Sequence, residues 1–317
     1  MIKYFANNNS FIVLLIPVFV VLHMLLDYYF PSFSMSTVGQ ENLWNLDFGS
    51  LDPIYSRILA LVFICVNAVL INFVFNSLSF YDKFIYLPSV LYILMVFLFP
   101  ISLRFGEDLV GHLFFILSFY QLLSIEQNED ARNNTFLSAL FLGAAATFLP
   151  VYSAFFLVIW FGLYTIRPFV LREYILPIFG FIFPFLWVVL VNPFFLREMF
   201  SFYSYLSYTN VRDFVIYFAY LVVVIMAILA NKKILERRIK SSIRYKRIIS
   251  VTFVSLLFSI VISTLILISH ETYFYFTTAV AILPFILPYA YLNVKRKWLP
   301  NTLFYLLIIL NIVKFFY

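Results

Sequence analysis

The feature that most constrains this chain is a series of long apolar stretches, separated by short polar breaks, that runs from residue 11 to the end. A helix needs roughly 20 apolar residues to cross a membrane, and the chain has room for about eleven such stretches. Of its residues 64% are hydrophobic and only 11% are charged, whereas about a quarter are charged in a soluble domain. We therefore expect an all-α, polytopic membrane protein in which residues 1–317 form a single integral-membrane domain, with no separate soluble domain.

The polar breaks set the boundaries of the expected spans. The expected spans are 11–26, 58–75, 84–103, 109–125, two short helices within 135–166, a seventh span to 191, an eighth ending at 230, one on each side of His270, and a last span ending near 317. Pro150 divides the stretch 135–166, because proline removes a helical hydrogen bond and disfavours helical geometry in the residue before it. Pro284 and Pro288 are expected to kink the tenth span. The first span lacks a small-residue cleavage site and is expected to stay uncleaved.

Charge indicates sidedness. If the N-terminus is inside and the spans alternate, sixteen of the 21 Lys and Arg residues lie on the inner side and five on the outer side, while nine acids lie outside and six inside. Inner loops of membrane proteins carry the excess of Lys and Arg. The sequence therefore predicts eleven transmembrane helices with the N-terminus inside and the C-terminus outside.

Ionisable side chains are confined to the span ends. No Asp, Glu, Lys or Arg falls in the middle of a predicted span, which argues against an ion-coupled transporter, because such proteins place charges within the membrane. The single cysteine, Cys65, excludes intrachain disulfides and cysteine metal sites. Any catalysis is expected at a membrane surface.

The stretch 104–112 gathers the strongest candidates for a site. The outer end of the predicted span 109–125 carries four ionisable side chains, Arg104, Glu107, Asp108 and His112. The two acids at a helix start complement the helix dipole, which alone would explain them. The functional alternative is a general base, or an anchor for a metal or phosphate, beside Arg104.

Each of the three histidines has a carboxylate neighbour. The pairs are His23 with Asp27, Asp108 with His112, and His270 with Glu271. A separation of four residues places two side chains on one helix face, and each of the three pairs could hold a divalent metal ion or pass a proton. The alternative is that histidine is simply tolerated near helix ends, and the sequence leaves any cofactor unknown.

The run 232–247 contains eight basic residues and one acid, Glu236. With apolar residues interleaved, it predicts a short helix lying on the anionic inner leaflet, in contact with membrane lipids. Nucleic-acid binding is not expected, because the run is short and tied at both ends to spans.

The order of these parts resembles the GT-C superfamily of membrane glycosyltransferases. Asp27 and the acids of the first outer loop match one family feature, Glu107 and Asp108 match a second, and the segment from Gly143 through Pro150 to Arg167 matches a helical hairpin. The likeness covers residues 1–175, and residues 176–317 would be additional transmembrane helices.

That resemblance implies transfer, or assisted transfer, of a sugar from a polyprenyl-phosphate carrier at the outer face. Asp27 or Asp108 would act as base or metal ligand with help from Glu107, Arg104 would hold phosphate, and His23 and His112 would contact substrate.

A second resemblance is to an uncharacterised bacterial multi-pass family of unknown function. It rests on Arg167, Pro168, Phe169, Arg172 and Glu173, followed by a span with two prolines, and it implies a protein of the bacterial inner membrane. The alternative functions are a non-enzymatic subunit of an envelope assembly complex, with membrane-protein partners, and a lipid or glycan flippase. Convergence of Asp27, Arg104, Asp108 and His112 would favour the enzyme, and side chains directed into water would favour the subunit.

Overall fold

The computed structural model describes residues 11–29, 42–44, 46–98, 104–127, 130–192, 214–270, 277–292 and 298–314, and every regular element in them is helical. The α-helices are α2 (Phe11–Tyr29), α3 (Pro53–Ser77), α4 (Leu87–Phe97), α5 (Glu107–Ser124), α6 (Arg132–Phe148), α7 (Phe156–Ile166), α8 (Leu171–Val191), α10 (Phe214–Lys240), α11 (Ile243–His270), α12 (Thr277–Ile282) and α13 (Trp298–Val313). The 3-10 turns are η1 (Phe48–Ser50), η3 (Ile125–Gln127), η4 (Pro150–Phe155), η7 (Leu283–Phe285) and η8 (Leu287–Ala290). The predicted all-α class is confirmed for this part of the chain.

Four helical segments are long and apolar enough to cross a membrane. They are Pro53–Ser77, Leu171–Val191, Phe218–Lys240 and Ile243–Leu265. Four shorter apolar helices, Leu15–Tyr29, Leu87–Phe97, Pro150–Ile166 and Trp298–Val313, overlap other expected spans, and α4 ends at Phe97, six residues before the predicted boundary. The expected tenth span contains only the six-residue α12 followed by 3-10 turns. The helices therefore have the length and composition of a membrane protein.

Proline breaks the helices where the sequence indicated. Leu149 is extended, with φ −134° and ψ 99°, so α6 stops at Phe148 and the chain passes through η4 into α7. The predicted division of 135–166 into two helices is confirmed. Pro284 and Pro288 do more than kink the tenth segment, because α12 ends at Ile282 and both prolines lie in 3-10 turns.

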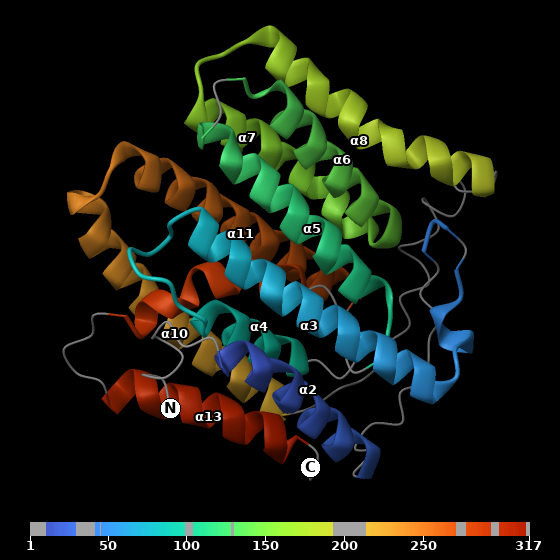
Figure 1. The fold of residues 1–317 in the computed structure, drawn as a ribbon, viewed down its shortest axis with the longest axis vertical. Helices are drawn as coiled ribbons and strands as arrows, with labels where there is room; N and C mark the ends of the chain where they lie inside the picture. Colours follow the sequence, from blue (N-terminus) through green and yellow to red (C-terminus); the bar gives the residue numbers. More distant parts are fainter. Residues whose placement is uncertain are drawn as a thin grey trace.

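The basic run 232–247 does not form the predicted surface helix, and that prediction is wrong. Instead α10 continues to Lys240, the chain turns, and α11 begins at Ile243 (Figure 1). The Ser242 hydroxyl accepts a hydrogen bond from the Tyr245 N–H at 3.3 Å. A serine that caps the first turn of a helix favours a new start over continuation, so the basic residues divide between two helices.

The helices share one apolar core, and α8 lies at the edge of the bundle against α6 (Figure 1). Glycine allows this close approach. A β-carbon on Gly143 would lie 2.4 Å from the Phe181 carbonyl oxygen, and one on Gly180 would lie 2.5 Å from the Phe136 oxygen. Small residues at contacts of this kind let two helical backbones approach, which favours association of apolar helices in lipid.

One end of the bundle gathers the ends of α2 and α4 with the starts of α3 and α5, and we call it the acidic end. Arg57 in α3 pairs with Asp27 in α2 at 3.3 Å, and the Phe105 N–H donates to Ser56 Oγ at 3.0 Å. These segments were predicted to lie on one side of the membrane.

The opposite end holds the α3–α4 connection, the end of α5 and the turn between α10 and α11, and we call it the basic end. Arg237 pairs with Asp82 at 2.7 Å, and Arg247 lies 3.6 Å from Glu126. These segments also share a side in the predicted alternation.

Candidate functional site

The two acids predicted as site residues open α5 at the acidic end. Glu107 and Asp108 occupy the first turn, where their charge complements the helix dipole. Neither side chain is directed into water, because Glu107 is 8% exposed and Asp108 only 1%. A buried carboxylate is costly unless it is compensated, so helix capping alone does not account for their position.

Asp108 lies in a group of buried polar side chains that we call the Asp108 cluster. Its members are Asn67 of α3, Tyr92 of α4, Asp108 and His112 of α5, and Tyr152 of η4, all at most 1% exposed. The Tyr92 hydroxyl and His112 Nδ1 are 3.1 Å apart. The predicted Asp108 and His112 are thus brought together with residues from three other elements.

The rest of the cluster is held by short contacts. Asn67 Nδ2 donates to the Leu109 carbonyl at 3.0 Å, and the Tyr152 ring stacks on Phe115 with centroids 4.9 Å apart. The Asp108 carboxylate is within electrostatic range of the Tyr92 and Tyr152 hydroxyls. The Tyr92–His112 contact can pass a proton between the phenol and the imidazole, and the charge of Asp108 acts on the Tyr92 hydroxyl.

Glu107 is enclosed by the chain segment before α3. Its Oε1 accepts a hydrogen bond from Asn42 Nδ2 at 3.1 Å. The Leu43 N–H donates to the Thr147 carbonyl at 3.2 Å, and Asn192 Nδ2 donates to the Leu43 carbonyl at 3.3 Å. This segment therefore joins the start of α5 to the ends of α6 and α8.

Burial changes the acidity of Glu107, which precedes the apolar stretch 109–125. Desolvation raises the pKa of this carboxyl to about 7, and the neighbouring charges of Asp108 and Asp47 act in the same direction, against hydrogen bonds from the backbone and Asn42. A carboxyl with such a pKa exchanges protons near neutral pH, which suits acid–base chemistry.

Asp27 belongs to a separate group on α2. Its carboxylate pairs with Arg57 at 3.3 Å, and the Arg57 guanidinium lies over the Tyr28 ring, 5.4 Å from its centroid. The charge of Asp27 is thus largely balanced by an arginine that the sequence did not indicate as its partner.

His23, one turn before Asp27, is buried and stacks on Phe97 at 3.9 Å between ring centroids. The Lys314 ammonium donates to the Phe97 carbonyl and is within electrostatic range of both Asp27 and His23. The residue that follows α13 (Trp298–Val313) therefore contributes a cation to this group, which no local pattern predicted.

The six predicted residues are consequently distributed over more than one site. Asp108 and His112 share a cluster, Glu107 adjoins it, and His23 with Asp27 forms another group. Arg104 is half-buried, and within the described ranges no hydrogen bond or ion pair links it to the other five.

The structure bears on the metal hypothesis through the grouping of ligands. In the part of the chain described, no three side chains of His, Cys, Asp or Glu come together as a metal-binding group. The Asp108 and His112 pair would offer two ligands from this set. Glu271 and the side chain of His270 lie outside the described residues.

Sequence reasoning missed Asn67, Tyr92 and Tyr152. Asn67 was detectable in principle, because an amide in the middle of a 25-residue apolar helix is unusual. The tyrosines carried no such signal among 23 of their kind.

Comparison of the chain with protein-family models, with curated protein sequences and with solved structures found no match. The functional argument therefore depends on the residues and their geometry.

Proposed function

We propose that this chain is a multi-pass protein of the bacterial inner membrane that transfers, or helps to transfer, a sugar from a polyprenyl-phosphate carrier at its outer face, in the manner of GT-C enzymes. The observation that carries this proposal is the buried Asp108, placed beside His112 and Tyr92 at the acidic end. Burial of an ionisable group inside a protein is costly, and such groups cluster at functional sites.

In this reaction Asp108 acts as the general base. It accepts the proton of an acceptor hydroxyl while that oxygen forms a bond to the sugar carbon, and the bond from this carbon to the carrier phosphate breaks. The polyprenyl phosphate leaves with the bonding electron pair. Tyr92, on which the charge of Asp108 acts, contacts His112 at 3.1 Å, and this contact gives the proton a further path.

Two basic groups at the same end suit the phosphate. Arg104 is the predicted phosphate ligand, and Arg57 is held in place by Asp27 at 3.3 Å. A guanidinium presents a fixed set of donors that matches phosphate oxygens. Asp27 would then position Arg57, and Asp108, not Asp27, would act as the base.

The rival function is a non-enzymatic membrane subunit. The enclosure of Asp108 favours it, because a side chain 1% exposed contacts substrate only if the surrounding segments open. In that case the Asp108 cluster would fix the packing of four helical elements and carry no chemistry.

Substitution of Asp108 by Asn separates the two functions. Asn keeps the size of the side chain but removes the base, so we expect surface glycan to fall by at least tenfold in cells that carry only the variant. Lectin binding or mass spectrometry of the envelope would measure the glycan, and immunoblotting of membranes would show equal protein.

Asp130→Asn is the control, because Asp130 is an exposed acid that lies outside the acidic end. Normal glycan with Asp108→Asn at wild-type protein level would refute the catalytic role and leave the subunit function.

A further inference from the structure

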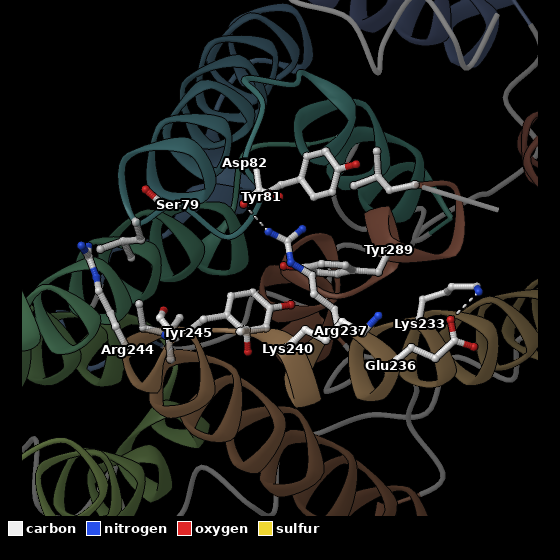
Figure 2. A pocket seen from close by; sticks show the side chains of 15 residues that line it. Ser79, Tyr81, Asp82, Lys233, Glu236, Arg237, Lys240, Arg244, Tyr245 and Tyr289 are labelled. Carbon is white, nitrogen blue, oxygen red and sulfur yellow. Dashed lines mark hydrogen bonds and ion pairs between the residues drawn. The ribbon is translucent and has the colours of Figure 1, made fainter.

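A pocket of about 710 Å³ opens at the basic end (Figure 2), and its lining includes no member of the Asp108 cluster. Its walls are the α3–α4 connection, the last turns of α10, the turn at Ser241 and Ser242, the start of α11 and η8. Four cationic side chains line it, Lys233, Arg237, Lys240 and Arg244.

Arg237 is held in the pocket by contacts with three side chains. Its guanidinium donates to Asp82 at 2.7 Å and lies between two aromatic rings, 4.8 Å from the centroid of Tyr81 and 5.0 Å from that of Tyr245 (Figure 2). The hydrogen bond to Asp82 uses one of the five guanidinium N–H donors. An arginine held in this way is preorganised for an anion with several oxygen atoms.

The pocket has an excess of positive charge. Only two acids line it, Asp82, which pairs with Arg237, and Glu236, which lies 2.6 Å from Lys233. No carboxylate of the described residues lies within salt-bridge distance of Lys240. Arg244 lies 3.9 Å from Glu126, which is not part of the pocket lining, so the excess positive charge rests on Lys240 and in part on Arg244, and it favours an anionic ligand.

The start of α11 adds to this preference. Ser242, which lines the pocket, caps α11, a helix of 28 residues that begins at Ile243. The positive end of the α11 dipole therefore lies at the pocket. Helix N-termini favour phosphate groups because unpaired N–H donors and the dipole act together.

Apolar side chains next to the pocket place it at a lipid boundary. Ile239 is 81% exposed and Ile243 is 69% exposed, and each adjoins a cation of the pocket in sequence. Side chains of this kind are stable in contact with acyl chains, while the neighbouring cations reach the headgroup region. A free phosphate compound would gain nothing from this apolar border.

We propose that the pocket binds the phosphate group of a lipid headgroup, with Arg237, Lys240 and Arg244 as its cationic ligands. The site is separate from the Asp108 cluster, and the proposal does not depend on the proposed sugar transfer.

The test uses the full chain purified in a neutral detergent. Thermal unfolding, followed by tryptophan fluorescence, would be recorded against increasing phosphatidic acid, phosphatidylcholine or inorganic phosphate. We expect a saturable rise in Tm with phosphatidic acid only. Lys240→Gln should weaken the apparent affinity about fivefold, and the double variant with Arg244→Gln about 25-fold, since each basic residue near a lipid surface contributes about 1 kcal/mol.

Arg132→Gln is the matched control, because Arg132 is an exposed cation at the basic end that does not line the pocket. Equal weakening by Arg132→Gln would overturn the proposal in favour of diffuse charge attraction. An equal rise in Tm with inorganic phosphate would overturn the lipid assignment. A cooperative unfolding transition without lipid, with a Tm close to that of the wild type for Lys240→Gln, would show that the variants fold. Arg244→Gln loses an ion pair of 3.9 Å with Glu126 and should lower the Tm only slightly.

Discussion

The two ends of this protein use ionisable residues in opposite ways. At the acidic end Asp108 and His112 are enclosed with Asn67, Tyr92 and Tyr152. At the basic end the cations Lys240 and Arg244 border an open pocket of about 710 Å³. Polar groups without water need fixed partners from several helices, whereas groups in contact with water or headgroups need few. The first arrangement should therefore govern stability, and the second should govern ligand binding with little effect on stability.

The largest expected effect is at Tyr92. Replacement by Ala empties a fully buried site and removes the hydroxyl that contacts His112, so we expect a loss of about 3–5 kcal/mol of unfolding free energy. Reversible unfolding in mixed micelles would measure it. Tyr92→Phe keeps the ring and should lose only about 1–2 kcal/mol, the cost of a missing buried hydrogen bond. A loss below about 1 kcal/mol with Ala would mean that the cluster is not tightly packed.

The second effect depends on pH and concerns Glu107. Because its pKa is raised to about 7 in the fold, from 4.5, the folded state resists ionisation of this carboxyl. The wild type should therefore lose stability relative to Glu107→Gln as pH rises from about 4.5 to about 7, by up to about 3 kcal/mol in total. Above pH 8 the difference should be constant.

Unfolding of both proteins across pH 4–9 would test this expectation. The Gln side chain still accepts the hydrogen bond from Asn42, so the comparison isolates the charge. A difference that does not vary with pH would show that Glu107 is solvated.

The smallest effects are expected at the basic end. Arg237→Gln breaks a pair whose partner, Asp82, is 83% exposed, and it also removes contacts with two aromatic rings. We expect a loss of about 1 kcal/mol, because exposed ion pairs and cation–π contacts contribute little each. Lys240→Gln should change stability by less than about 0.5 kcal/mol. A loss of about 3 kcal/mol or more for either variant would erase the contrast between the two ends.

The sequence by itself determined the helical class and the approximate positions of most of the described helices. Hydropathy located the apolar stretches, and Pro150 located the break between α6 and α7. These properties are local, because apolar length and the missing proline N–H act within a few turns of chain. Alternation of the predicted spans also grouped the connections that meet at each end.

Only the tertiary structure decided which polar residues meet. A spacing of four residues predicted that Asp108 lies next to His112, and it predicted the same for His23 and Asp27. In the structure, however, Asp27 pairs with Arg57 and is also close to the charge of Lys314. The sequence of the basic run 232–247 predicted one surface helix. In the structure the run is divided between the end of α10 and the start of α11, and the two parts line a pocket together with Asp82. The physical reason is that contacts between helices depend on the rotation and packing of each helix, which the spacing of residues along one helix does not specify.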